Sequence, residues 1–356
     1  MKRPCACLIG LCVAWLVSPA AGAAESSPAP TTEARPAIAS RADTRPRKVV
    51  VASAVVEATG PVEARLKLVG QMVDDAAHEA SVKYSGHGLD LMVFPEFTLL
   101  RESGTTAAER AVTLAGPVLQ TLGAKAREHH TWLIVGMTLQ EEGAVGRFSN
   151  AAVLLDRAGR VAGIFRKVHP ITDGHGGFEE GVTPGGGYPV FDCDFGRVGI
   201  LICWDMAYEE AWEALAAGGA ELVALPTASP QNLRPAAAAL QHRYYVVNSA
   251  PRDNAPVFDP IGRTIAQQTT APGVVVHQID LSFAILHWSE TLREGRALTD
   301  RFKSGGSYST REDTGVFWSN DPQRSIGSMI RELDLHEMPA EIERMEAARL
   351  KATPKR

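Results

Sequence analysis

The sequence predicts an α/β fold with mixed β-sheets, and three observations carry this prediction. Short apolar segments alternate with segments whose apolar residues recur at helical spacing. Several of the apolar segments pair as hairpins, which supply antiparallel strands. The order of strands and helices also occurs twice, in two sets of about equal length. This repeat suggests two sheets packed together, with helices on the outside.

The first set of elements runs from Lys48 to Lys167. Its first helix, predicted over Pro61–Ser81, places Val69 and Val73 on one face at helical spacing. The other segments of this set are strands at Val49–Val56, Asp90–Phe94, Trp132–Met137, Asn150–Asp156 and Val161–Lys167, and a second helix at Gly116–His130.

A long Gly-rich loop, Val168–Tyr188, separates the two sets, and loops of that length inside a compact domain are usually functional. The second set repeats the order of the first. Its segments are a hairpin that combines Pro189–Asp192 with the buried strand Val198–Ile202, helices at Glu209–Ala217 and Arg234–Arg243, strands at Glu221–Leu225 and Tyr245–Ala250, a hairpin at Val257–Gln268, and a last strand at Gly273–Ile279.

The chain divides into four regions. Residues 1–23 have a basic start, a short apolar run and the small residues Ala21-Gly22-Ala23, a pattern typical of a secretory signal peptide. Residues 24–47 are rich in Pro, Ala, Ser and Thr and are predicted to be a disordered linker. A single domain is predicted over residues 48–284. The extension over 285–356 carries aromatic residues in polar sequence and is expected to pack on the domain or on a partner subunit.

These regions predict an exported protein, periplasmic or secreted, with no stable insertion into a membrane. Cleavage after residue 23 takes the formal net charge from −5 to −7, because Lys2 and Arg3 are lost. An acidic chain offers no basic face to nucleic acid. A retained N-terminal anchor is the alternative, although the apolar run is short for a membrane span.

Only two cysteines, Cys193 and Cys203, lie outside the predicted signal peptide. A hairpin turn near Gly196 would place Cys193 opposite the residues around Val198, so that Cys203 lies roughly 16 Å further along the strand. A disulfide needs Cα atoms within about 7 Å. We therefore expect Cys193 to be packed and Cys203 to be a free thiol.

Three ionisable residues stand at the ends of apolar strands: Glu96, Lys167 and Cys203. Ligands gather at the carboxyl ends of strands in α/β sheets, so these residues can converge on one site. Each has a structural alternative: a carboxylate in the first turn of a helix, a strand-end lysine in water, and a packed core thiol. An acid, a cation and a thiol at three such positions together favour a catalytic site.

The same residues lie in motifs that resemble the nitrilase superfamily of carbon–nitrogen hydrolases. The motifs are VFPEF around Glu96, NAAVLLDRAGRVAGIFRKVHP leading to Lys167, and GRVGILICWDMAYEEAW around Cys203, and the resemblance covers about residues 48–280. It implies an αββα sandwich, a Glu-Lys-Cys triad and a homo-oligomer, a dimer or larger. It also implies a second glutamate before a Pro-Gly pair, for which Glu180 fits best and Glu179 is the neighbouring alternative.

The residue types suggest how a small amide would be cleaved without a metal or cofactor. Glu96 would take the proton of the Cys203 thiol, and Lys167 with the backbone N–H of Trp204 would stabilise the oxyanion. A thioester on Cys203 would then be hydrolysed, while Glu180 orients Lys167 or the substrate. Further pocket walls are expected from other side chains, namely Phe97, Trp204, Tyr208 and Thr227.

Two other functions stay open at this stage. Cys203-Trp204-Asp205 lies between the patterns of nitrile-cleaving and amide-cleaving members, and Asp205 with EGVTPG favours an amidase. A secreted binding protein that kept the fold and lost the activity is the rival from another class. A metal hydrolase or a serine hydrolase is disfavoured, because neither H-E-x-x-H nor G-x-S-x-G occurs.

Overall fold

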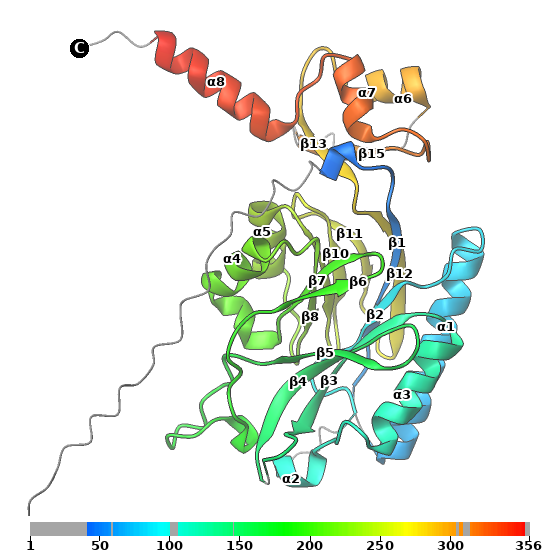
Figure 1. Cartoon of the computed structure of the whole chain (residues 1–356), viewed down its shortest axis with the longest axis vertical. Helices are drawn as coiled ribbons and strands as arrows, with labels where there is room; N and C mark the ends of the chain where they lie inside the picture. Colours follow the sequence, from blue (N-terminus) through cyan, green and yellow to red (C-terminus); the bar gives the residue numbers. More distant parts are fainter. Residues whose placement is uncertain are drawn as a thin grey trace, which may run out of the picture. The chain divides into compact units, whose positions relative to one another are not determined.

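The structure is a computed structural model that describes residues 41–57, 60–99, 106–144, 146–303, 306–308 and 314–352 (Figure 1), apart from the side chains of Glu180 and of residues 306–308. The predicted signal peptide, the first part of the predicted linker and Cys5, Cys7 and Cys12 lie outside these residues. No helix among the described residues is both long and apolar enough to span a bilayer.

The first sheet has six strands in the order β12-β1-β2-β3-β4-β5. Parallel pairing joins β1 to β2 and β2 to β3, whereas the remaining pairs are antiparallel, so the sheet is mixed as expected. The strands are β1 (Lys48–Val55), β2 (Leu91–Val93), β3 (Trp132–Gln140), β4 (Phe148–Leu155), β5 (Val161–Arg166) and β12 (Gly273–Asp280).

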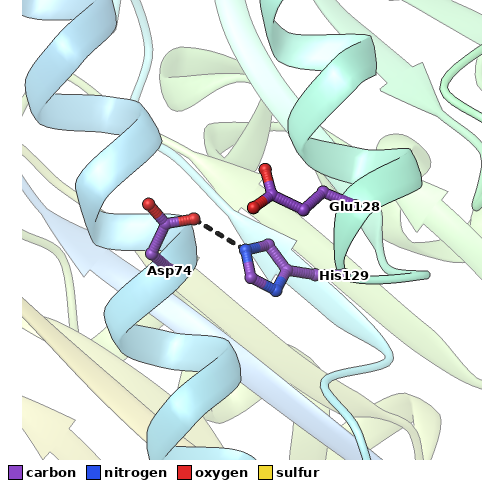
Figure 2. Close-up of side chains that lie close together, drawn as sticks. All are labelled: Asp74, Glu128 and His129. Atoms are coloured by element: carbon purple, nitrogen blue, oxygen red, sulfur yellow. Dashed lines mark hydrogen bonds and ion pairs between the residues drawn. The ribbon is translucent and has the colours of Figure 1, made fainter.

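Two helices, α1 (Val62–Lys83) and α3 (Pro117–Glu128), cover the outer face of this sheet (Figure 1). They are joined through Asp74 of α1, which accepts hydrogen bonds from Lys125 at 2.7 Å and from the ring of His129 at 2.6 Å. Figure 2 shows Asp74 and His129 facing each other, with Glu128 beside them. A short helix, α2 (Ala107–Arg110), lies between β2 and α3 in the sequence.

The second sheet also has six strands, in the order β11-β10-β9-β8-β7-β6. Its helices are α4 (Glu209–Ala217) and α5 (Leu233–His242), and its strands are β6 (Val190–Cys193), β7 (Gly196–Ile200), β8 (Leu222–Pro226), β9 (Tyr245–Ser249), β10 (Ala255–Phe258) and β11 (Thr264–Gln268). A 3-10 helix, η3 (Cys203–Ala207), follows β7 directly.

Alternating side chains of β1 show how the layers are built. Val49 and Val51 belong to the apolar cluster between the two sheets, whereas Val50 and Ala52 belong to the cluster under α1 and α3. A period of two along a strand sends successive side chains to opposite faces, so β1 is apolar throughout because both of its faces are covered. The two-sheet sandwich with outer helices is therefore confirmed.

The cysteines are both free, as expected. The register of their hairpin differs from the prediction, because the turn is made by Asp194 and Phe195 and Cys193 pairs with Gly196 rather than with residues around Val198. Cys203 lies beyond the end of β7, at the start of η3.

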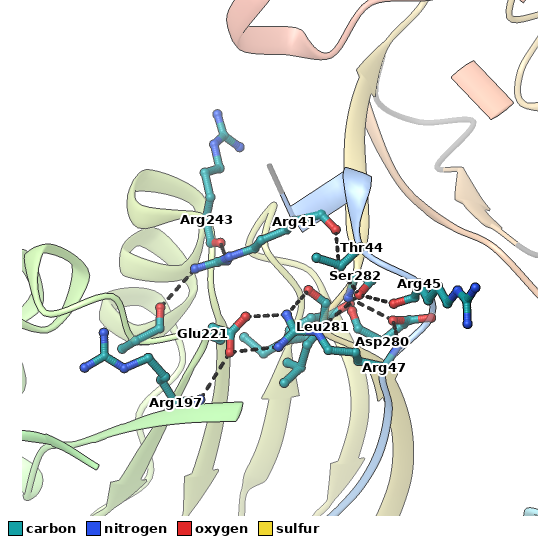
Figure 3. Close-up of polar contacts among 12 residues, drawn as sticks. Arg41, Thr44, Arg45, Arg47, Arg197, Glu221, Arg243, Asp280, Leu281 and Ser282 are labelled. Atoms are coloured by element: carbon teal, nitrogen blue, oxygen red, sulfur yellow. Dashed lines mark hydrogen bonds and ion pairs between the residues drawn. The ribbon is translucent and has the colours of Figure 1, made fainter. Parts of the chain in front are cut away.

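Residues 41–47, assigned above to a disordered linker, are ordered, and this is a correction. Arg47 forms an ion pair with Glu221, and Arg41 donates to the carbonyl oxygens of Ala220 and Arg243 at 3.0 and 2.5 Å. Figure 3 shows these arginines reaching across from one sheet to the other. The prediction of disorder rests on a composition rich in Pro and Ala, and composition gives no information on the distant partners of Arg41 and Arg47.

The segment after β12 has a small apolar core of its own, which the sequence did not predict. Strand β13 (Phe283–His287) pairs with β15 (Thr314–Trp318), which in turn pairs with β14 (Gly306–Tyr308). Helices α6 (Arg296–Phe302) and α7 (Ile326–Glu332) and the 3-10 helix η1 (Arg41–Asp43) add apolar side chains to this cluster. The final helix, α8 (Met338–Ala352), buries no side chain.

Candidate active site

Three strand ends deliver their ionisable side chains to one cavity. Glu96 follows β2, Lys167 follows β5 and Cys203 follows β7, and all three residues are at least nine-tenths buried. The cavity has a volume of about 300 Å³. Its lining comprises Glu96, Phe97, Lys167, Ile171, Glu179, Cys203, Ala228, Ser229 and Arg252.

Glu96 is held by two donors on the same carboxylate oxygen. Its Oε1 accepts from Asn150 Nδ2 at 2.7 Å and from Lys167 Nζ at 2.9 Å. The strand β3 passes close behind: a Cβ added at Gly136 would lie 2.8 Å from the Glu96 Cα, which no real Cβ tolerates. Gly136 therefore lets the Glu96 turn sit against the sheet, and Asn150 fixes the side chain from the neighbouring strand.

Lys167 lies between two carboxylates. Its Nζ is 2.9 Å from Glu96 Oε1 and 2.6 Å from Glu179 Oε1. Burial alone would lower the pKa of Lys167, but Glu96, Cys203 and Glu179 together outweigh it and raise the pKa. Lys167 is thus a permanent cation at neutral pH, which suits it to stabilise negative charge and not to act as a base.

The second glutamate in the cavity is Glu179, the neighbouring alternative to the preferred Glu180. The Gly-rich loop folds as a small hairpin in which Thr172 bridges Phe178 and the N–H of Glu179 donates to the carbonyl of Ile171 at 2.7 Å. The chain then enters the 3-10 helix η2 (Glu179–Gly181). This hairpin register points the Glu179 carboxylate at Lys167, so Glu179 replaces Glu180 in the proposals below.

Cys203 occupies a strained backbone position at the turn from β7 into η3. Its φ of +46° lies in the left-handed region that side chains with a Cβ rarely adopt. Burial first and the Glu96 carboxylate second raise the pKa of the thiol to about 12, against the lowering influence of Lys167, the Thr227 side chain and the Ala228 backbone N–H. The resting sulfur is therefore a neutral thiol that needs a base.

Asp205 connects the Cys203 turn to the chain after Lys167. Its fully buried carboxylate accepts from the backbone N–H of His169 at 2.7 Å and of Ile202 at 3.1 Å. Burial raises the pKa of Asp205, and these backbone donors lower it. The His169 ring also stacks on Tyr208, with ring centroids 3.4 Å apart. One carboxylate thus fixes the spacing of two strand ends that bear Lys167 and Cys203.

The predicted pocket walls fall in three places. Phe97 lines the cavity at a positive φ of +53°. Thr227 contacts the Cys203 thiol, and Tyr208 packs on His169, and neither is among the residues that line the cavity. Trp204 is 47% exposed beside Cys203, also outside that lining.

Several residues of the site were missed by sequence reasoning. They are Asn150, Gly136, Ile171, Ser229 and Arg252. The position of Asn150 at the start of an apolar strand was a usable signal, because a polar side chain inside a buried strand needs a partner. No comparable pattern marked Arg252, which lies in the loop between β9 and β10.

Away from this cavity, the described residues contain one cluster with the spacing of metal ligands, Asp74, Glu128 and His129 (Figure 2). The Lys125 ammonium already contacts both Asp74 oxygens, at 2.7 and 2.9 Å, and lies 3.0 Å from Glu128. A divalent cation would have to share this space with a fixed positive charge. The cluster is therefore best explained as an ion pair that joins α1 to α3.

Comparisons with known proteins show which family this chain resembles. A family model described as carbon–nitrogen hydrolase matches residues 53–285. A probable nitrilase of Schizosaccharomyces pombe is 30% identical over 159 residues, which are 44% of this chain and 56% of that protein. A deaminated glutathione amidase of Yersinia enterocolitica is 29% identical over 158 residues, 42% of this chain and 55% of that protein. The chain thus spans about half the length of these two relatives.

Among solved structures, the fold is similar to that of Saccharomyces cerevisiae Nit3, a member of branch 10 of the nitrilase superfamily. The TM-score is 0.58 at 20% identity, and the match covers 69% of this chain and 93% of that one. At this identity the likeness concerns the fold alone.

Proposed function

Because the chain belongs to the carbon–nitrogen hydrolase family, we propose that it hydrolyses the C–N bond of a small amide through a thioester on Cys203. The observation that carries this proposal is the cavity itself, in which the Cys203 thiol shares one lining with the Glu96–Lys167 ion pair. The amidase named among the relatives supports the choice of an amide, as does Asp205 after Cys203-Trp204.

In the first half of the reaction, Glu96 takes the proton of the Cys203 thiol as the sulfur attacks the amide carbonyl carbon. Among the described residues, Asn150 and Lys167 both donate to Glu96 Oε1, so Oε2 is the oxygen that we assign to the proton. The carbonyl electrons move to oxygen, and the Lys167 ammonium and the Trp204 backbone N–H stabilise that charge.

The tetrahedral intermediate then breaks its C–N bond. Glu96 returns the proton to the departing nitrogen, which leaves as ammonia or an amine, and the acyl group stays on Cys203 as a thioester. In the second half, water gives a proton to Glu96 and its oxygen attacks the thioester. Cleavage of the C–S bond releases the carboxylic acid, and the sulfur regains the proton from Glu96. Glu179 keeps Lys167 in place throughout.

A Cys203→Ala variant tests the proposal, with Cys193→Ala as the matched control. Both changes remove one sulfur from the same hairpin region, but only Cys203 lines the cavity. The full chain is incubated with a small amide and with the nitrile of the same carbon skeleton, while released ammonia and the intact mass are followed. We expect turnover and an acyl adduct in the wild type and in Cys193→Ala, and neither in Cys203→Ala.

Retained turnover in Cys203→Ala would refute the proposal. Faster consumption of the nitrile than of the amide would make the protein a nitrilase that uses the same residues. Export remains a proposal that rests on the composition of residues 1–23, and the N-terminal residue of the protein recovered from a periplasmic or culture fraction tests it.

A further inference from the structure

The charges that line the active-site cavity balance only when Arg252 is included. Glu96 and Glu179 supply two negative charges, and Lys167 and Arg252 supply two positive ones. Lys167 is already bound to both carboxylates, at 2.9 and 2.6 Å, and the proposed reaction assigns its third N–H to the oxyanion. Arg252 is therefore the cation of this lining that is left for a distant part of the substrate.

The surroundings of Arg252 leave its guanidinium available. Its closest described carboxylate is that of Asp253, with Nε and Oδ2 separated by 3.6 Å, which is too long for a hydrogen bond. The two side chains are 53% and 72% exposed, and an ion pair between such groups contributes little. Arg252 thus stands on the loop after β9, half in water and half against the cavity.

We infer that Arg252 is a specificity-determining residue that binds a carboxylate at the far end of the acyl chain, so the preferred substrates are monoamides of short dicarboxylic acids. This inference rests on the proposed amide hydrolysis and adds the substrate class. The guanidinium matches a carboxylate through two parallel N–H donors. A cavity of about 300 Å³ lies at the small end of ligand pockets, which limits the chain to a few carbons.

Electrostatics supports the same assignment. Without Arg252 the lining would carry a net negative charge, and the chain as a whole is also acidic, at −5. An anionic substrate would then be repelled from both the surface and the cavity. A cation at the rim reverses the local field and orients the substrate, with its carboxylate outward and its amide toward Cys203.

The test compares two amides of equal chain length, the monoamide of glutaric acid, which is anionic, and pentanamide, which is neutral. The measured quantity is the ratio of their kcat/KM values. The wild type is expected to prefer the anion, and Arg252→Gln is expected to lower the ratio by roughly 10- to 100-fold, the range for a charge-assisted hydrogen bond. Arg252→Lys should lie between them, because an ammonium keeps the charge and loses the paired donors.

Asp253→Asn is the matched control. It changes a charge on the adjacent residue, and asparagine tolerates the positive φ of +64° found there. The ratio should stay within about twofold in this variant. A second measurement needs no variant: added salt should reduce the wild-type ratio, because screening weakens the attraction to the anion and leaves the neutral amide unaffected.

Equal kcat/KM for the two amides in the wild type, or an unchanged ratio in Arg252→Gln, would overturn the inference while amide hydrolysis stands. If neither amide is consumed and no adduct forms on Cys203, the proposed function itself fails. Should both Arg252 variants misfold, a salt-independent wild-type ratio would still count against the inference.

Discussion

Replacing Asp205 by asparagine should separate the geometry of the site from its chemistry. Asp205 takes no part in the proton transfers of the proposed reaction. Its carboxylate accepts hydrogen bonds from the backbone N–H groups of His169 and Ile202, and so links these two segments. Lys167 lies two residues before His169, and Cys203 directly follows Ile202. Asparagine has nearly the same shape but only one acceptor oxygen, so one of the two backbone donors will face an NH₂ group.

The expected loss of stability follows from these contacts. A hydrogen bond to a charged acceptor contributes about 1.5–3 kcal/mol, and a buried N–H without an acceptor costs about 1–3 kcal/mol. Part of this loss is offset, because burial raises the pKa of Asp205 and so disfavours its charge. We expect the free energy of unfolding to fall by about 2 kcal/mol. The displaced strand ends should lower kcat roughly 10- to 100-fold, since small misplacements are costly in a positioned site.

Asp259→Asn is the matched control for Asp205→Asn. Asp259 is also buried, and in the β10–β11 hairpin away from the cavity its Oδ1 accepts from the backbone N–H groups of Ile261 at 3.1 Å and Arg263 at 2.9 Å. Its Oδ2 accepts from the Arg263 guanidinium at 2.7 Å, and Asp259→Asn replaces that ion-pair oxygen by an NH₂ group. Urea unfolding and steady-state kinetics are measured for both variants below their unfolding transitions. A similar loss of stability is expected in both, with a fall in kcat only in Asp205→Asn. Equal kcat in the two variants would refute the positioning role.

Two further substitutions and one chemical modification probe neighbouring parts of the site. Gly136→Ala should lower kcat at least tenfold, because its Cβ would lie 2.8 Å from the Glu96 Cα. Gly70→Ala in α1 should leave kcat unchanged, because its Cβ would meet only the Lys125 side chain, at an ordinary 3.5 Å. Asn150→Asp removes the amide that donates to Glu96 Oε1 and places a second carboxylate beside it, so steady-state kinetics should show kcat/KM lowered by roughly 10- to 100-fold. Burial raises the pKa of Cys203 to about 12, so its alkylation by iodoacetamide, followed by mass spectrometry, should accelerate about tenfold per pH unit from pH 7 to 10; a plateau below pH 9 would contradict this.

The strand ends were predictable from the sequence because each one combines a buried apolar run with an ionisable residue at its end. An apolar run that stops at Glu96, Lys167 or Cys203 marks both the strand and the point where a side chain leaves the core. The carboxyl ends of such strands gather in α/β sheets, so three distant residues could be placed in one cavity. The same logic yielded the two sheets and the outer helices, since the apolar period differs between strands and helices.

What the sequence left out depends on long-range partners. The ordering of residues 41–47 rests on Arg41 and Arg47, whose acceptors lie near Ala220 and Glu221 in the opposite sheet. Asn150 was read only as part of a strand, although its amide fixes Glu96. A polar residue in an apolar strand indicates that Asn150 needs a partner, but the sequence does not identify the partner in either case, because the paired segments are far apart along the chain.

The placement of the Glu179 carboxylate follows from the register of a short hairpin. Glu179 and Glu180 are adjacent, and a motif that locates a glutamate relative to a later Pro-Gly pair cannot distinguish them. The register is set earlier, where the N–H of Glu179 binds the carbonyl of Ile171 and the Asp173 carboxylate caps the turn. This register brings Glu179 within 2.6 Å of Lys167 Nζ. The Gly-rich loop is therefore part of the charge network that keeps Lys167 protonated, in addition to forming a wall of the cavity.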